Sequence, residues 1–320
     1  MPTTKKPQSR RKTVYHVRNW KAYDQALVKR GSLTLWIDED VRRQWAYAGP
    51  AQRGAQFTYS DLAIEAMLSV KEVFHLPNRA TEGLGRSIFE LLGVDLEVPD
   101  HTTLSRRGKT VPIRLPKTAR GPLHLVLDST GLKVYGEGEW KVRQHGYSKR
   151  RTWRKIHLSV DAESGEIQAA LLTEAGVHDA EAVPELLAQI ERPLASAAGD
   201  GAYDRANVYM ALNAYAPEAQ INIPPRRGAM IQQHGNAHAP PRPRDENLRF
   251  IRQHGRAKWK RASGYHRRSL AETAVFRFKT LFGDHLSARR LDTQATQVGI
   301  RCRLINRMTQ LGMPQSYKVA

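Results

Sequence analysis

Two short apolar runs, each followed by an aspartate, constrain the fold of this chain more than any other feature. Leu123–Leu127 precedes Asp128, and Leu194–Gly199 precedes Asp200. Apolar runs of this length, bounded by turn residues, predict buried strands. A helical pattern at Asp179–Ile190 lies between them, so the two strands are expected to belong to one sheet. Strands that end on the same side of a sheet would bring both carboxylates to one crevice.

Other segments complete this predicted sheet. Lys155–Val160 alternates apolar and polar residues as a half-buried strand does, and Ile167–Thr173 predicts a second strand after a turn at 161–165, giving an antiparallel meander. A helix at about Arg205–Tyr215 and a strand at Gln220–Ile223 follow. The pattern predicts an α/β fold with a mixed sheet, which we assign to a domain at residues 120–312.

Residues 15–115 have a helical pattern instead. Ser60 precedes a helix with a stripe of Leu62, Ala66, Val70 and Val73. Asn78 is the expected cap of a second helix, with Leu84, Ile88 and Leu91 facing inward, and Gly93 its stop. Asp100 is the expected cap of a third.

The third of these helices, at about residues 101–107, ends in Arg106 and Arg107. A short helix that begins with small polar residues and ends in arginines suits a DNA contact. A helical bundle with a solvated basic face has the same pattern, and the sequence alone leaves both interpretations open.

The charge balance favours a polyanionic partner. The chain has 51 Lys and Arg against 31 Asp and Glu, a formal net charge of +20, which raises the local concentration of nucleic acid. A membrane partner is not expected, since the sequence has no run of 18 apolar residues and no long basic amphipathic helix. Residues 1–14 predict a basic flexible tail rather than a secretory signal. The only cysteine, Cys302, excludes an internal disulfide framework and is compatible with a cytoplasmic protein.

A basic segment at about 224–264 interrupts the predicted domain. From Pro224 to Arg268 the chain has 12 Lys or Arg and two acids, which predicts a solvated loop that faces DNA. Its histidines, His234, His238 and His254, with His266 just beyond, have irregular spacing and do not suggest a zinc site. Trp259, like Trp140 and Trp153, lies among basic residues, where a ring can stack on an unpaired base. Packing in the core is the more common role of such a ring.

A third acid completes a possible metal site. Glu272 lies on the helix that follows the basic segment. Mg²⁺ prefers oxygen ligands, so carboxylates from separate elements suffice to bind it. Two such ions about 3.5–4 Å apart can activate an attacking oxygen and stabilise a leaving one in phosphodiester displacement. Each acid alone has an ordinary structural explanation, an Asx turn, a strand-ending turn or a solvated helix residue. The hypothesis rests on the combination.

The sequence around Glu272 carries a family signature. It fits Y-x2-R-x3-E-x6-K with Tyr265, Arg268, Glu272 and Lys279. This block resembles bacterial insertion-sequence transposases of the DDE type, especially the insertion-sequence-5-like group. The Asp200–Arg205 and Asp128–Lys133 segments are similar to the second and first aspartate blocks of that family, in the same order. Asp161 and Asp204 lie near these blocks but are predicted to be a turn residue and a cap or supporting residue.

The resemblance implies an RNase H-like catalytic core in which Asp128, Asp200 and Glu272 hold two Mg²⁺ ions, with Mn²⁺ as a substitute. It implies cleavage of double-stranded DNA at terminal inverted repeats and transfer of the cut end to target DNA, by a homodimer on DNA in the bacterial cytoplasm, at the nucleoid. The N-terminal helices and the basic segments would recognise the terminal repeats. The residues expected to contact DNA are Tyr265, Arg268, Lys279, Arg106, Arg107, Lys149, Arg150, Arg151 and Trp259.

Two other functions fit the same residues in part. One is an RNase H-like nuclease that cuts DNA without joining it. The other is a transposase-derived repressor that binds DNA without cutting it, against which the presence of all three carboxylates argues.

Overall fold

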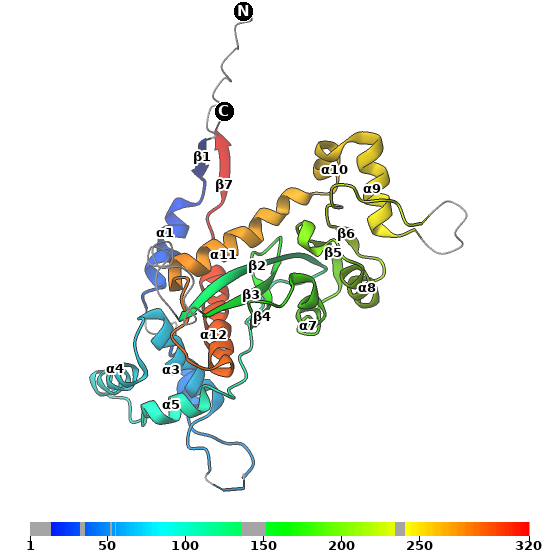
Figure 1. Cartoon of the computed structure of the whole chain (residues 1–320). Helices are drawn as coiled ribbons and strands as arrows, with labels where there is room; N and C mark the ends of the chain where they lie inside the picture. The colour runs from blue at the N-terminus through cyan, green and yellow to red at the C-terminus, as the bar shows by residue number, and fades with distance from the viewer. Residues whose placement is uncertain are drawn as a thin grey trace, which may run out of the picture.

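A computed structural model of the chain describes residues 14–32, 36–51, 53–54, 56–135, 152–233 and 241–319. It contains a five-stranded mixed sheet in the order β4-β3-β2-β5-β6 (Figure 1). The strands are β2 (Leu123–Tyr135), β3 (Thr152–Asp161), β4 (Ile167–Glu174), β5 (Leu194–Ala198) and β6 (Gln220–Asn222). β2, β3 and β4 pair antiparallel, whereas β5 pairs parallel with β2 and β6 parallel with β5. The prediction of a mixed α/β sheet is therefore confirmed.

Strand β2 is longer than the sequence predicts, and Asp128 lies within it rather than at its end. On one side β3 pairs with β2 from Leu125 to Tyr135, so the backbone stays extended beyond the apolar run. On the other side the pairing with β5 stops at Val126. Asp128 therefore lies just beyond the end of β5, which is where Asp200 leaves the sheet.

Helices cover both faces of the sheet. α7 (Val183–Leu187) and α8 (Ala206–Tyr215) pack on one face, in a core that includes Leu125 and Leu127. α11 (Ser269–Phe282) and α12 (Leu291–Leu311) pack on the other, in a core that includes Val126. Strand β3 is for this reason buried on both sides from residue 156 to 161, and its predicted half-exposed character is wrong.

The α-helices described before the sheet are α1 (Trp20–Lys29), α2 (Glu39–Arg43), α3 (Asp61–Val73), α4 (Asn78–Leu91) and α5 (His101–Arg107). The Ser60 side chain accepts from the Ala63 amide at 3.1 Å and the Asp100 side chain from the Thr103 amide at 2.6 Å, so both predicted caps are confirmed. α4 instead has Pro77 at its N-cap, and Leu91, predicted to face inward, is 86% exposed. Buried residues of α3 belong to the same core as α11 and α12, so these helices and the sheet share one interior.

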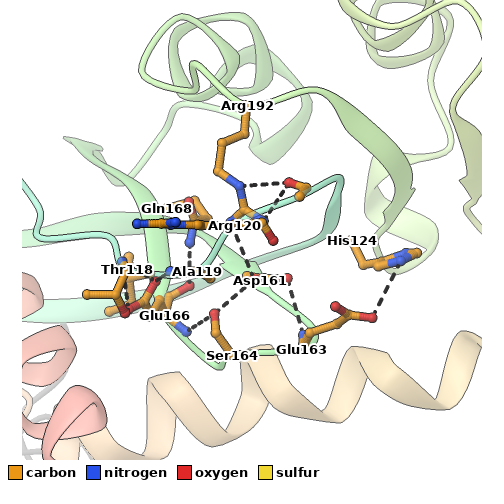
Figure 2. Close-up of polar contacts among 12 residues, drawn as sticks. Thr118, Ala119, Arg120, His124, Asp161, Glu163, Ser164, Glu166, Gln168 and Arg192 are labelled. Atoms are coloured by element: carbon orange, nitrogen blue, oxygen red, sulfur yellow. Dashed lines mark hydrogen bonds and ion pairs between the residues drawn. The ribbon is translucent and has the colours of Figure 1, made fainter.

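The segment that enters β2 is tied to the sheet by polar contacts (Figure 2). The buried Glu166 carboxylate accepts from the Thr118 amide at 3.1 Å and from its hydroxyl at 2.6 Å. Arg192 donates to the Gly121 carbonyl at 3.1 Å and lies 3.5 Å from the Asp161 carboxylate. Asp161 also accepts from the Ser164 hydroxyl at 2.8 Å in the turn after β3. Asp161 therefore supports this turn, as predicted.

The basic segment has no helix at residues 224–233 but is helical over most of 243–262, and the prediction of a loop is wrong there. It forms α9 (Pro243–His254) and α10 (Arg256–Ala262), which lie in Figure 1 at the end of the molecule away from α3–α5. Asp204 anchors it: its buried carboxylate accepts from Arg244 Nε at 2.8 Å and from the Arg226 amide at 2.9 Å. Pro243 at the first turn and Gly255, with φ of +80°, delimit α9.

Several elements differ from the sequence pattern or were not predicted by it. η2 (Asp179–Glu181) replaces the start of the predicted helix at 179–190, and η3 (Gly201–Tyr203) and η4 (Tyr265–Arg268) are short 3-10 turns. β1 (Val14–Val17) and β7 (Ser316–Val319) pair antiparallel. Among the described residues, none of the helices combines the length and apolarity that a bilayer span requires.

One buried acid between α3 and α12 gives a pH-dependent prediction. Glu65 is 7% exposed, and burial raises its pKa to about 7 although Arg303 lies 3.1 Å away. Because the folded pKa exceeds the unfolded one, the stability that protonated Glu65 gives is present below pH 4.5 and is lost as pH rises through about 7. We expect Glu65→Gln to raise the free energy of unfolding by roughly 1–3 kcal/mol at pH 8. The gain should be small at pH 4. Urea unfolding at both pH values tests this, with the exposed Glu90→Gln as control; an equal gain at both would contradict it.

Candidate active site

Arg268 links two of the predicted acids. It stands at the end of η4, one turn before Glu272 in α11. Its Nη1 donates to Glu272 Oε1 at 2.6 Å, and its Nη2 lies 4.0 Å from Asp200 Oδ2. One guanidinium thus lies between a carboxylate of α11 and a carboxylate that follows β5.

Asp200 is fixed by the turn that it begins. β5 ends at Ala198, and the Asp200 side chain accepts from the Ala202 amide at 2.8 Å as the cap of η3. Its side chain is 44% exposed and that of Glu272 54% exposed. Both carboxylates are therefore open to solvent and to a ligand.

Asp128 is the more enclosed member of this group. Burial raises its pKa, and the charges of Asp200 and Glu272 add to the effect, while the Ser129 amide and Arg268 oppose it. Contributions of this kind arise only between charges that lie within a few ångströms of one another. The three acids that the sequence singled out therefore interact electrostatically around Arg268.

Tyr203 is part of this site, and the sequence analysis did not single it out. It is 1% exposed, and its hydroxyl has no hydrogen-bond partner among the described residues. Burial raises its pKa, and the charges of Asp179, Asp128 and Asp200 act in the same direction. The signal that could have found it is its place in the Asp200–Arg205 block.

The arrangement of these acids bears on metal binding. Among the described residues, no group of three or more His, Cys, Asp or Glu side chains is close enough to hold an ion as it stands. The Arg268 guanidinium lies within 4.0 Å of both the Asp200 and the Glu272 carboxylates. Three carboxylates that balance one guanidinium are nevertheless a donor set that suits a hard divalent cation.

The comparison with known families decides what this chain is. A family model described as "Transposase DDE domain" matches residues 119–307, which is more than half of the chain and includes all three acids. The chain belongs to the DDE transposase family. A second model of the same description matches residues 28–137, which contain α2 to α5 and the first acid.

A solved transposase structure also resembles this DDE transposase. It is a piggyBac transposase synaptic complex with hairpin DNA, 12% identical in sequence. The likeness covers 88% of this chain and 75% of that one, with a TM-score of 0.39. A likeness of this degree adds nothing to the family assignment.

The predicted DNA contacts of this transposase differ in their exposure and in their distance from the acids. Arg106 is exposed on α5, and Tyr265 and Lys279 are half-buried. Lys279 lies about 10 Å along α11 from Glu272, at 1.5 Å per residue. A hydrogen bond from Lys133 lowers the pKa of Asp284, and the charge of Lys279 acts in the same direction. The remaining predicted contacts in the basic excursion, Lys149, Arg150 and Arg151, lie outside the described residues.

Two predicted DNA contacts need correction. Trp259 is 2% exposed, and its indole nitrogen donates to Asn247 Oδ1 at 2.9 Å, so the ring packs α10 on α9 and cannot stack on a base. Arg107 is 6% exposed; it donates to the Tyr59 carbonyl at 2.8 Å and pairs with Asp61. Its guanidinium pairs with an acid within the N-terminal helices and is not available to contact a phosphate.

Proposed function

We propose that this protein binds the terminal inverted repeats of a bacterial insertion sequence of the insertion-sequence-5-like group, cuts DNA there and joins the cut end to target DNA. The mixed sheet with Asp128 and Asp200 is then the RNase H-like core of the enzyme. The observation that supports the proposal best is the single guanidinium that Glu272 and Asp200 share beside Asp128. The acids come from β2, from the turn after β5 and from α11, which lie far apart in the sequence.

In this proposal Asp128, Asp200 and Glu272 hold two Mg²⁺ ions, for which Mn²⁺ substitutes. Bound divalent ions supply activation of the attacking oxygen and stabilisation of the leaving one. Glu272 must release Arg268 to take up this role. The freed guanidinium then stands beside the acids and can hold a phosphate with two parallel hydrogen bonds.

The bond changes follow from the two reactions. In cleavage, a water oxygen attacks a phosphorus at the element end, the bond from that phosphorus to the 3′ oxygen breaks, and the 3′ oxygen takes a proton. In strand transfer, the freed 3′ hydroxyl attacks a target phosphorus and loses its proton, and the target 3′ oxygen leaves. Positioning and charge account for the catalysis in both steps, without a covalent enzyme intermediate.

The partners proposed are double-stranded DNA at the element ends and at the target. The net charge of +20 favours both. The described residues that we assign to DNA contact are Arg106, exposed on α5, Arg268 and Tyr265, at the acids, and Lys279, farther along α11. Because an element has two ends, we propose that a homodimer assembles on the DNA.

Two assays separate this function from its alternatives. A labelled duplex that carries the DNA flanking the gene should be cut in Mg²⁺ or Mn²⁺ and left intact in EDTA. A pre-cut end with a free 3′ hydroxyl should then be joined to a plasmid. Cutting without joining would identify a nuclease, and binding without cutting would identify a repressor.

A further inference from the structure

We propose that the pocket between the N-terminal helices and the start of α12 binds a DNA phosphodiester backbone outside the catalytic crevice. The proposal rests on the proposed function in one respect, namely that DNA is the substrate. The pocket has a volume of about 850 Å³. Its walls come from α3 and α5 on one side and from residues 282–301 on the other.

Positive charge dominates the lining. Lys109 follows α5 and Arg289 precedes α12, so they face the pocket from opposite walls, and both are exposed. Neither side chain forms an ion pair within 4.0 Å among the described residues. The pKa of the nearby Asp292 is lowered mainly by a hydrogen bond from Arg290, and the charge of Lys109 adds to this effect. Lys71, Arg290 and Arg301 also line the pocket, but each is paired with an acid: Lys71 and Arg301 with Glu72, and Arg290 with Asp292.

The one acid in the lining is neutralised within the protein. Glu72 is 5% exposed and accepts from Arg301 Nε at 2.7 Å and from Gln297 Nε2 at 3.1 Å. Its charge is therefore compensated before a ligand arrives. An anion that enters this pocket encounters uncompensated positive charge and polar donors, which is the environment that phosphates require.

The wall that carries Arg289 is held in place. Gln297 Oε1 accepts from the Ser287 and Ala288 amides at 3.1 and 3.2 Å, and Arg301 Nη1 donates to the His285 carbonyl at 3.0 Å. These contacts fix the 285–288 segment on α12. The pocket is thus built before DNA binds, which reduces the entropic cost of binding.

A strained residue lies in the same lining. His75 has φ of +53°, the only positive φ at a non-glycine among the described residues. It follows the last turn of α3, where the Leu76 amide donates to the Lys71 carbonyl at 2.9 Å, a position that glycine usually occupies. An imidazole kept at some conformational cost at the edge of a basic pocket is consistent with a ligand contact there.

The position of the pocket distinguishes it from the catalytic crevice. Phe282, in its lining, lies ten residues after Glu272 on α11, or about 15 Å at 1.5 Å per residue. The phosphates held here are therefore not the ones that react. Charges on two opposite walls suit an extended anion, and a duplex that reaches the crevice can continue along α11 to this site.

Binding of a fluorescent DNA duplex to the full chain, measured in EDTA at several salt concentrations, tests the proposal. Lys109→Ala with Arg289→Ala should weaken binding about 10- to 100-fold at 0.1 M salt and reduce the log–log salt slope by about two, since each phosphate contact contributes about 0.9. The matched control is Lys21→Ala with Lys29→Ala, which removes the same charge from exposed sites on α1. Equal weakening in the two double variants, or an unchanged slope, would overturn the proposal.

A second measurement does not depend on any variant. Acetylation of Lys109 in the wild-type protein should slow when duplex is added, while acetylation of Lys21 and Lys29 should not. Equal protection of all three would count against the pocket. The outcomes remain separable from those of the proposed function. If the protein binds DNA through Lys109 and Arg289 but never cuts it, the proposed function is rejected and the pocket proposal stands. If the protein cuts DNA and the double variant binds DNA as the wild type does, the pocket proposal is rejected and the proposed function stands.

Discussion

Asp128→Asn is expected to slow metal-dependent DNA cleavage by at least about 10³-fold, equivalent to roughly 4 kcal/mol of transition-state stabilisation. The substitution keeps the shape of the side chain and removes one of the three charges that we assign to holding the ions. Asparagine offers a neutral oxygen in place of a carboxylate, which weakens the binding of hard divalent cations. DNA affinity in EDTA should stay within about twofold of the wild type, because no phosphate contact is removed.

Loss of the fold would not explain such a result. Burial and the neighbouring acids raise the pKa of Asp128. With a folded pKa above the unfolded one, this group favours folding at low pH, and that contribution disappears as pH rises through the folded pKa. At pH 8 the charged Asp128 therefore opposes folding, and the asparagine variant should melt at the same or a higher temperature than the wild type.

The measurement is the rate of duplex cleavage at saturating protein in Mg²⁺ and in Mn²⁺, with a melting curve for each variant. Asp24→Asn, the same change at an exposed position on α1, is the matched control and should cleave like the wild type. Full cleavage by Asp128→Asn would remove the mechanism proposed for this enzyme.

The acids were accessible to sequence analysis because their signals are local. Asp200 follows an apolar run, and Arg268 and Glu272 are one helical turn apart. The length of β2 was not accessible in this way. Its apolar run stops at Leu127, yet β3 pairs with it as far as Tyr135, and backbone hydrogen bonds do not depend on which side chains are apolar.

The errors on Arg107 and Trp259 have a common physical cause. The partners of Arg107, Tyr59 and Asp61, are 48 and 46 residues away in the sequence. Trp259 is buried because α9 is a helix that presents Asn247 to it, and the abundance of Arg and Pro had predicted a loop. Composition indicates that a segment is basic, but the packing that uses a side chain depends on distant residues.

Glu72→Ala is expected to lower the free energy of unfolding by about 3–5 kcal/mol, because it leaves a buried guanidinium without its counter-charge. The side chains of Glu72 and Arg301 are 6% and 5% exposed, and their atoms lie 2.7 Å apart. Glu72 belongs to α3 and Arg301 to α12, so the pair connects the N-terminal helices to the covering of the sheet. Gln297, which also donates to Glu72, would lose a partner as well.

Urea unfolding of Glu72→Ala measures this loss, and Glu72→Leu, Arg301→Met and the double variant that combines them measure the coupling within the pair. Glu39→Ala removes an exposed i,i+3 partner of Arg42 and should cost less than about 1 kcal/mol. Glu72→Leu combined with Arg301→Met should recover much of the loss, because replacing both charges by apolar groups removes the desolvation penalty along with the attraction. Strictly additive effects of these two substitutions would show that the pair does not couple the two regions. Recovery would instead mean that the charges of the pair are dispensable for stability, because apolar packing can replace them.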